Sequence, residues 1–265
     1  MKMQTPSGLI SLLTDFGLYD PFVGVMKGVI LARFPEARIV DLCHGIAAQD
    51  VVEGAFWLER SFGWFPPGTV HVAVVDPGVG SDRQALAVRS CGQIFVGPDN
   101  GLLGGLIAAD PSAEVRLIDR NRFGLPPPSA TFHGRDIFAP VAAEIAAWHL
   151  GFVDVGPENP AAVGPVVPAA HRSGDRIDGC VVSVDRFGNL ITNIDVLLLQ
   201  GLASPIAGIA NLERPLVRTY SDAVSGDFVA LVGSFGTVEF ARRDGDAAAS
   251  LALGRQSLAY VRSGT

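Results

Sequence analysis

Polar side chains suited to hydrogen bonding and proton transfer occur in this sequence where apolar runs end. Asp15 follows such a run in LLTDFG, and Asp76 and Arg83 lie in VVDPGVGSDR. Asp99 lies in VGPDNG, and His133 lies in FHGRD. Because ligands of open α/β sheets bind outside the carboxyl ends of the strands, we expect Asp15, Asp76 and Asp99 to face one crevice. Aspartate and histidine in such a crevice are common groups for accepting protons.

The familiar motifs for nucleotide binding and for serine hydrolysis are incomplete. A G-x-G-x-x-G fingerprint would need glycine where Arg83 stands, and the sequence has neither a Walker A lysine nor a G-x-S-x-G elbow. The three cysteines form no CxxC pair, and the histidines form no HExxH pattern. We therefore expect no disulfide framework and no metal in the site.

The elements that must position these residues alternate between short apolar runs and helical patterns in the first half of the chain. This alternation is typical of βαβ units with a mainly parallel sheet. The expected strands are residues 9–14, 38–42, 69–75, 85–89, 93–96 and 114–118. The expected helices are residues 21–33, 51–62 and about 136–149. For the first helix we expect Asp20 as N-cap and Pro21 at the first helical position.

The second half of the chain has a different pattern. Residues 155–175 are rich in Pro, Gly and Ala, lack an amphipathic period and are expected to form a linker. Short β-type runs follow in IDGCVVSVD, NLITNI, RPLVRTY, DFVALVG and TVEFAR. We therefore predict an α/β fold, with an N-terminal layered α/β domain (1–160) and a smaller C-terminal β-barrel domain (175–265).

Composition and charge narrow the function. The chain is 48% hydrophobic and 18% charged, as expected of a globular protein. Its net charge is −7 and its 20 basic residues are scattered, so nucleic acid is not an expected partner. The apolar run 9–13 is too short for a signal-peptide core, and no run reaches the roughly 18 apolar residues of a membrane span. We expect a cytoplasmic protein that acts on a small molecule.

Six segments, in this order, resemble one enzyme family, the S-adenosylmethionine hydroxide adenosyltransferases. They are LLTDFG, VVDPGVGSDR, VGPDNGLL, FHGRDIFAPVAA, VDRFGNLITNI and GSFGTVEFARRDGDAA. The family is related to the adenosyl-fluoride and adenosyl-chloride synthases. The resemblance implies a homotrimer that binds S-adenosylmethionine at the interface between subunits. Water or hydroxide then attacks the ribose C5′, which gives adenosine and methionine without a cofactor.

The resemblance also implies a role for particular residues. The catalytic triad falls on Asp76, Arg83 and His133. Asp76 or His133 accepts the proton, while Arg83 orients Asp76 and biases the water toward hydroxide. Because the leaving group is a neutral thioether, the reaction needs positioning and local electrostatics but no general acid. Asp15 is expected to accept hydrogen bonds from the two ribose hydroxyls.

The resemblance places the other substrate contacts in the C-terminal domain. Asp185 is expected to bind the methionine ammonium, Phe187 to stack on adenine, and Asn189 to bind the adenine edge. Ser234 is expected to contact the methionine carboxylate. Glu239 and Ala247 are expected to lie near adenine. The halogen-transferring relatives have arginine where Phe235 stands, so recognition of the carboxylate is expected to differ.

Two other functions fit the same motifs. A halide transferase would need a dry halide pocket instead of a water-orienting Arg83 and His133. A binding protein without activity would keep every ligand contact and would fail only at the triad. Retention of Arg83 and His133, and the absence of a long insertion between residues 100 and 131, favour the hydrolase.

Overall fold

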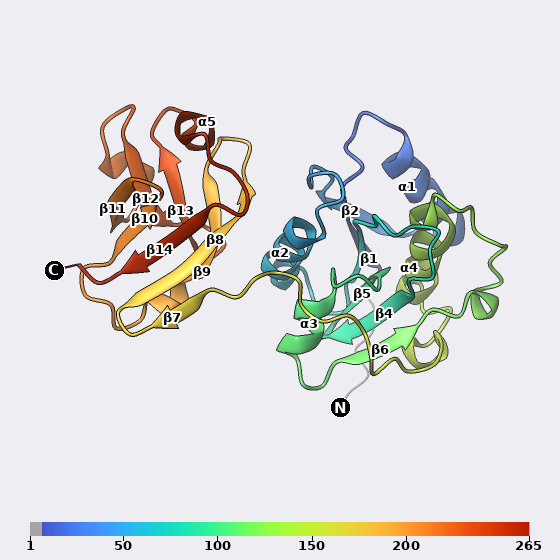
Figure 1. Cartoon of the computed structure of the whole chain (residues 1–265). Coiled ribbons are helices and arrows are strands. Elements are labelled where there is room, and N and C mark those ends of the chain that lie inside the picture. Colours follow the sequence, from blue (N-terminus) through green and yellow to red (C-terminus); the bar gives the residue numbers. More distant parts are fainter. Residues whose placement is uncertain (1–6, 265) are drawn as a thin grey trace. The chain divides into compact units, whose positions relative to one another are not determined.

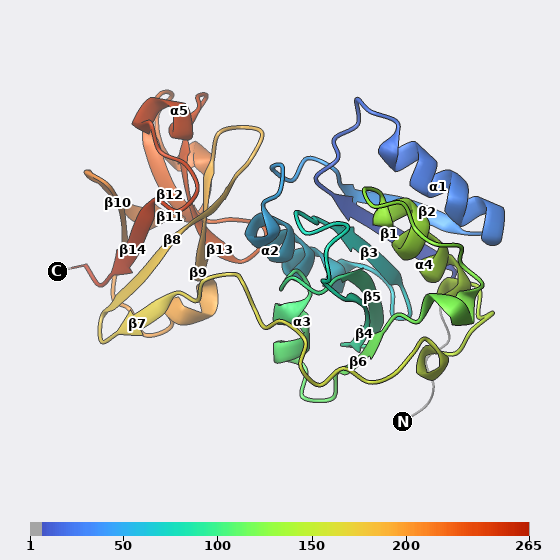
Figure 2. The ribbon, with the colours of Figure 1, turned by 45° about the vertical axis from the view of Figure 1, so that its right-hand side comes forward.

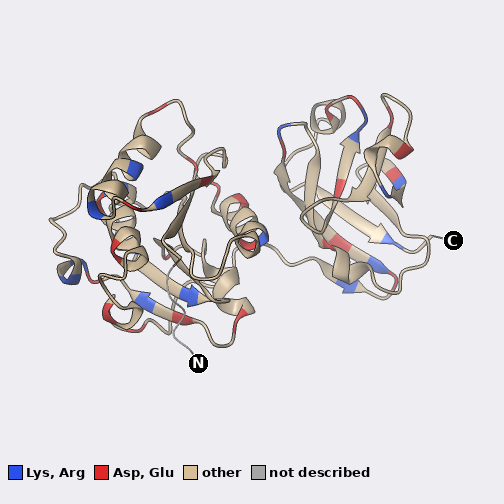
Figure 3. Cartoon of the chain, turned by 180° about the vertical axis from the view of Figure 1, so that it is seen from behind, with Lys and Arg blue, Asp and Glu red and all other residues tan. Residues whose placement is uncertain are grey.

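The chain is described by a computed structural model that covers residues 7–264 (Figure 1). It contains two compact units, which divide between Val166 and Val167. The first is a layered α/β unit and the second is a β-barrel, so the predicted fold class is confirmed. Within the described range, no helix is long and apolar enough to cross a membrane. Lys and Arg are spread over both units (Figure 3).

The N-terminal unit is built on a six-stranded sheet of order β2-β1-β3-β5-β4-β6. The strands are β1 (Leu9–Thr14), β2 (Arg38–Cys43), β3 (Val70–Val74), β4 (Ala85–Ser90), β5 (Gln93–Pro98) and β6 (Glu114–Leu117). Each expected strand is present and ends within two residues of its prediction. β1 pairs in parallel with β2 and β3, whereas β4 is antiparallel to β5 and β6. The central strands β3 and β5 are buried throughout, which explains their continuous apolar runs.

Helices cover both faces of this sheet (Figure 2). One face carries α1 (Phe22–Arg33) and α4 (Ala139–Ala146), and the other carries α2 (Val51–Ser61) and α3 (Gly104–Ala109). Arg33 Nη1 donates to Glu144 Oε1 at 2.7 Å, which ties α1 to α4. The short helices of the unit are η1 (Phe62–Trp64), η2 (Arg120–Phe123), η3 (Gly134–Phe138) and η4 (Phe152–Asp154).

Two expected helix starts differ from the structure. The first helix begins at Phe22 with Pro21 as N-cap, and no side chain caps it, so the expectation for Asp20 was wrong. The first helical hydrogen bond runs from the N–H of Val25 to the carbonyl oxygen of Pro21 at 2.9 Å, so the helix starts one residue later than expected. The helix expected from about 136 begins as the π-helical turn η3 and continues as α4. That turn places His133 directly before the first helical residue.

The C-terminal unit is a closed barrel. Its strands are β7 (His171–Ser173), β8 (Arg176–Val184), β9 (Leu190–Asp195), β10 (Ile206–Ile209), β11 (Leu212–Val217), β12 (Phe228–Val232), β13 (Thr237–Arg242) and β14 (Leu258–Arg262). The order is β14-β10-β11-β12-β13-β9-β8, and pairing of β14 with β8 closes it. β7 pairs with the first half of β8, although it lies in the segment expected to be a linker. The helices of the C-terminal unit are η5 (Val196–Leu199), η6 (Tyr220–Asp222) and α5 (Ala247–Leu251).

A buried histidine lies in the sheet of the N-terminal unit. His71, in β3, is fully buried and stacks on Phe95 with ring centroids 5.0 Å apart. Its Nδ1 lies 2.6 Å from Ser11 Oγ, and its Nε2 contacts Gln93 Oε1. Burial lowers the pKa of His71 to about 4, because the apolar surroundings disfavour the charged ring. The imidazole is therefore neutral in the folded protein.

A buried carboxyl group lies between α2 and α3. The side chain of Glu59 occupies the space that a Cβ on Gly105 would need, since such an atom would lie 1.8 Å from Glu59 Oε1. That oxygen is buried and has no hydrogen-bond partner within residues 7–264. Burial raises the pKa of Glu59 to about 7, because the charged form is poorly solvated there. Gly105 is required for this close approach.

Candidate functional site

Two of the expected aspartates follow adjacent parallel strands at the same edge of the sheet. Asp15 comes directly after β1, and Asp76 comes two residues after β3. The register pairs Thr14 with Val74, so both loops leave the sheet at the same level. Both side chains line a cavity of about 370 Å³. The cavity is lined by Asp15, Phe16, Phe22, Ala48, Gln49, Val74, Asp76, Pro77, Val79, Thr131, Phe132, His133 and Gly134.

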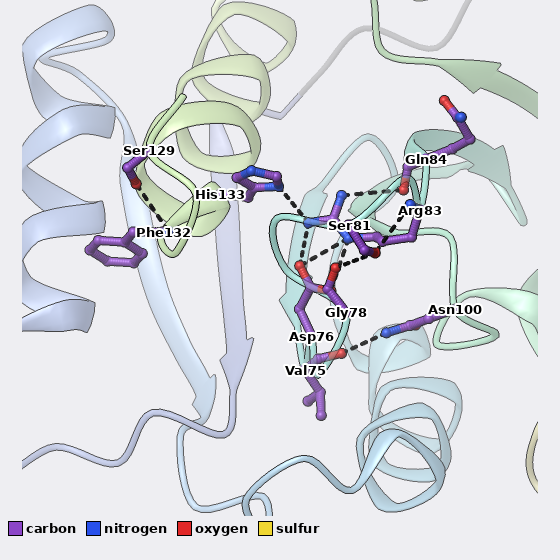
Figure 4. Close-up of polar contacts among 10 residues, drawn as sticks. All are labelled: Val75, Asp76, Gly78, Ser81, Arg83, Gln84, Asn100, Ser129, Phe132 and His133. Carbon is purple, nitrogen blue, oxygen red and sulfur yellow. Dashed lines mark hydrogen bonds and ion pairs between the residues drawn. The ribbon is translucent and has the colours of Figure 1, made fainter. Parts of the chain in front are cut away.

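Arg83 joins Asp76 to His133 (Figure 4). Its Nε lies 2.9 Å from Asp76 Oδ1 and 3.1 Å from Oδ2, and its Nη2 also donates to Oδ2. The same Nη2 lies 2.7 Å from His133 Nδ1. The side chains of Arg83 and Asp76 are only 9% and 5% exposed. A bidentate pair this well buried is fixed in geometry, because neither partner can be lost without leaving an unpaired buried charge.

The contact with Arg83 determines the protonation of His133. A guanidinium can only donate hydrogen bonds, so Nδ1 of His133 must accept and the ring proton lies on Nε2. Burial, and then the positive charge of Arg83, lower the pKa of His133 and keep the ring neutral. Within residues 7–264, Nε2 has no hydrogen-bond partner. The ring is therefore a donor to any group that reaches this nitrogen from the cavity.

The loops that carry the triad are fixed by close backbone contacts. Gly80 has φ +80°, and a Cβ there would lie 2.3 Å from the carbonyl oxygen of Ala130. Only glycine allows the loop with Arg83 to lie this close to the segment before His133. Asn100 Nδ2 donates to the carbonyl of Val75 at 2.9 Å, directly before Asp76.

Asp15 is held on one side only. Its Oδ2 accepts a hydrogen bond from the backbone N–H of Gln49 at 2.8 Å. Its Oδ1 accepts none within residues 7–264, which leaves that oxygen and the remaining lone pair of Oδ2 for a ligand. A carboxylate held in this way at a strand end can accept two hydrogen bonds from neighbouring hydroxyl groups.

An aromatic cluster lines the cavity beside these polar groups. Phe16, Phe22 and Phe132 meet edge to face, with ring centroids 5.9, 6.0 and 5.3 Å apart. None of the three rings was predicted from the sequence to belong to the site. Their only signal was position, because Phe16 follows Asp15 and Phe132 precedes His133. The rings make this wall of the cavity apolar, which limits access of water.

Asp99 does not belong to the cavity, so the expectation for this residue was wrong. Its Oδ1 accepts the backbone N–H of Val163 at 2.8 Å, and its Oδ2 lies 3.4 Å from Asn159 Nδ2. Asp99 directly follows β5 and contacts the segment 159–163. The carboxylate is therefore used to fix that segment.

In the C-terminal unit, Asp185, Phe187 and Asn189 share one turn between β8 and β9. Asp185 Oδ1 accepts from the backbone N–H groups of Phe187 and Asn189, both at 2.9 Å. Asp185 Oδ2 accepts from Asn189 Nδ2 at 2.9 Å. The side chain of Phe187 is 75% exposed, whereas Asn189 is buried. The turn thus presents an aromatic ring with two hydrogen-bonding groups beside it.

The remaining predicted residues lie on other elements of the barrel. Glu239, on β13, is buried and accepts a hydrogen bond from the hydroxyl of Tyr220, a residue that the sequence analysis missed. Burial raises the pKa of Glu239, and the nearby charge of Asp185 also raises it. Ser234 is exposed in the turn before β13, and Ala247 is fully buried at the start of α5. The structure joins Glu239 to Tyr220 and leaves the roles of Ser234 and Ala247 as predictions.

Within residues 7–264, no group of three or more His, Cys, Asp or Glu side chains is arranged to hold a metal ion. Both oxygens of Asp76 and Nδ1 of His133 accept hydrogen bonds from Arg83. The arrangement of Asp76, Arg83 and His133 is suited to orienting a small polar molecule and accepting its proton.

Two family models match the chain. Residues 10–155 match the SAM hydroxide adenosyltransferase N-terminal domain, and residues 179–258 match the C-terminal domain of that family. A protein from Thermus thermophilus, named (R)-S-adenosyl-L-methionine hydrolase, is 38% identical over 92% of this chain and 95% of its own length. A protein of the same name from Salinispora tropica is 39% identical, over 92% of this chain and 94% of the relative.

More distant relatives and solved structures agree with this match. A fluorinase from Actinoplanes sp. is 28% identical over 88% of this chain and 90% of the relative. The crystal structure of an uncharacterized conserved protein from Thermotoga maritima has a TM-score of 0.87 and 33% identity. The alignment covers 96% of this chain and 99% of that one.

Proposed function

The chain belongs to the SAM hydroxide adenosyltransferase family, and we propose that it is an enzyme that hydrolyses S-adenosyl-L-methionine to adenosine and L-methionine. The relatives with 38–40% identity are named hydrolases of the (R) epimer, so we propose the (R)-sulfonium as the substrate. The observation that carries the proposal is the buried contact of Arg83 with both Asp76 and His133 beside the cavity.

The proposed reaction is an in-line displacement at the ribose C5′. A water oxygen forms a bond to C5′ while the C5′–S bond breaks. The electron pair of the C5′–S bond moves to sulfur, which leaves as the neutral thioether of methionine. The attacking water loses one proton. Because the substrate is cationic and the leaving group neutral, the enzyme has to orient the water and remove that proton, and it need not protonate a leaving group.

We propose Asp76 as the proton acceptor, and the hydrogen bonds of the two candidate groups support this choice. His133 already carries a proton on Nε2, and its Nδ1 is occupied by Arg83, so the ring is a hydrogen-bond donor. Asp76 Oδ1 accepts one hydrogen bond from Arg83, whereas Oδ2 accepts two, so Oδ1 keeps a lone pair for a proton. We propose that His133 donates to the water oxygen while Asp76 receives the proton. Arg83 fixes both groups.

The proposed substrate contacts follow the expected ligand set. Asp15 would accept hydrogen bonds from the ribose hydroxyls through the oxygen that the protein leaves free. The turn with Asp185, Phe187 and Asn189, together with Ser234, Glu239 and Ala247, would bind the methionine and adenine groups. We also propose a homotrimer in which neighbouring subunits complete each site. Light scattering on the purified protein tests this, with a mass of three chains as the expected result.

The test of function is chromatography of the protein incubated separately with (R)- and (S)-S-adenosylmethionine. We expect adenosine and methionine in equal amounts from the (R) epimer. Asp76→Asn should lower kcat by roughly 10²–10⁴-fold. The matched control is Asp82→Asn, because Asp82 is an exposed aspartate in the same loop and should leave kcat unchanged.

Two results would contradict the proposal. Accumulation of 5′-chloro-5′-deoxyadenosine in the presence of chloride, in place of adenosine, would indicate the halide transferase. Tight adenosine binding without release of methionine, even at high protein concentration, would indicate a binding protein.

A further inference from the structure

We propose that His44 is a positioning residue that sets the orientation of Asp15 for the ribose hydroxyls. The inference rests on the proposed function of Asp15 and deepens it. His44 follows β2 and does not line the cavity. It would act through the backbone on both sides of Asp15 and through the loop that holds the Asp15 carboxylate.

His44 contacts the chain immediately before and after Asp15. Its Nδ1 lies 2.8 Å from the hydroxyl oxygen of Thr14, which precedes Asp15. Its carbonyl oxygen accepts the N–H of Gly17 at 2.8 Å, two residues after Asp15. The loop between β1 and α1 is thus fastened to one residue at two points. The carboxylate of Asp15 extends from the segment between these points.

The hydrogen bonds around His44 define its tautomer. Nε2 lies 3.1 Å from Asp41 Oδ1, and a carboxylate can only accept, so the ring carries a proton on Nε2. In the neutral ring Nδ1 then accepts from the hydroxyl of Thr14. The Thr14 oxygen in turn accepts the N–H of Phe16 at 3.2 Å. The Thr14 hydroxyl therefore uses its hydrogen and one lone pair, and its hydrogen points at His44.

The outer end of this chain of contacts is an ion pair. Lys27 Nζ, on α1, donates to Asp41 Oδ2 at 2.7 Å. His44 is 5% exposed and Thr14 is fully buried, whereas Lys27 and Asp41 are partly exposed. A series of side-chain contacts therefore links the end of β1 to α1, and it runs from Thr14 through His44 and Asp41 to Lys27. Displacement of His44 from the end of β1 would break its buried hydrogen bond with Thr14.

The loop that carries His44 also holds the Asp15 side chain. Gln49, in the same segment between β2 and α2, donates its backbone N–H to Asp15 Oδ2. Displacement of His44 would shift this donor together with the Thr14 and Gly17 contacts. The expected consequence is a carboxylate of unchanged charge in the wrong place, which weakens hydrogen bonds to two hydroxyls and leaves other contacts intact.

The test compares two ligands, adenosine and 2′,3′-dideoxyadenosine, by calorimetry. We expect the wild-type protein to bind adenosine more tightly. His44→Asn, which keeps a group near the Nδ1 position but does not reach Asp41, should weaken adenosine binding about tenfold. Binding of 2′,3′-dideoxyadenosine should be unchanged. In the hydrolysis assay the same variant should raise KM and largely keep kcat, as for loss of uniform binding.

The matched control is His71→Asn, because His71 is a buried histidine in the same sheet that makes no contact with Asp15 or its loop. It should lower stability without changing the ratio of the two affinities. If His44→Asn does not fold, Thr14→Val removes the same link and should reduce the same ratio.

Equal weakening of both ligands in the His44 or Thr14 variant would overturn the inference. Equal binding of both ligands by the wild type would also overturn it, because Asp15 would then not recognise the hydroxyls. Hydrolysis by the wild type is measured independently. If the role of His44 is wrong but the enzyme is active, the wild type still hydrolyses S-adenosylmethionine. If the proposed function is wrong, the wild type shows no hydrolysis.

Discussion

Glu59 and His71 predict opposing effects of pH on the stability of the N-terminal unit. Glu59 has its pKa raised from 4.5 to about 7, so the folded protein binds more protons than the unfolded chain in this range. Its contribution to stability is present below pH 4.5 and is lost as the pH rises through 7. His71 has its pKa lowered from 6.5 to about 4. Its contribution is present above pH 6.5 and is lost as the pH falls through 4.

The two effects are similar in size. One unit of pKa shift corresponds to about 1.4 kcal/mol, so each shift is worth about 3 kcal/mol across its whole range. Between pH 4.5 and 6.5 the slopes have opposite signs, and these two contributions should largely cancel. Substitution of either residue should therefore reveal how the unfolding free energy depends on pH through the other residue.

The variant to make first is Glu59→Gln, because an amide has nearly the shape of the protonated carboxyl group. Relative to wild type, its unfolding free energy should rise by about 3 kcal/mol between pH 4.5 and 7.5. Denaturant unfolding at a series of pH values measures this difference, and the other titrating groups cancel in it. His71→Gln should instead lose stability, relative to wild type, as the pH rises from 4 to 6.5.

Glu36→Gln is the control, because Glu36 is exposed and its curve should run parallel to that of the wild type. If the Glu59→Gln curve is also parallel to the wild type, the carboxyl group titrates normally in the folded protein. The reasoning from its burial and missing partner would then be refuted.

Three further substitutions test other parts of the structure. Gly54→Ala would place a Cβ 2.9 Å from Val75 Cγ2 and 3.1 Å from Leu102 Cδ1, so it should lower the unfolding free energy by about 1–3 kcal/mol in denaturant titrations. Asn100→Asp removes the donor to the Val75 carbonyl beside Asp76, so kcat should fall about tenfold with KM nearly unchanged. Tyr220→Phe removes the donor to Glu239 and should weaken substrate binding about tenfold in calorimetry, with a small change in melting temperature.

Much of the fold was predictable because its signals are local. The buried central strands appear as short apolar runs, and Asp15, Asp76 and His133 lie where expected beside the cavity. β7, β10 and β14 were not predicted, and β14 pairs with β8, which lies far earlier in the sequence. Asp20 is not the cap because the carbonyl of Pro21, and not that of Asp20, accepts the first helical hydrogen bond.

The less predictable features depend on contacts between distant segments. Asp99 looks like Asp76 in the sequence, yet it accepts the backbone N–H of Val163, which lies 64 residues further along the chain and is signalled by no local pattern. The partner of Glu239 is Tyr220, 19 residues away, and its role was likewise hidden. The family resemblance supplied the triad, and only the geometry gave the tautomer of His133.

The contact between Gly80 and the Ala130 carbonyl has a consequence for protein engineering. The loop with Arg83 and the segment before His133 are about fifty residues apart in the sequence, yet they fit together only because Gly80 lacks a side chain. A loop grafted from a relative, or a library that randomises residues 78–82, would have to retain this glycine or move both segments together. The two segments should therefore be redesigned as one module.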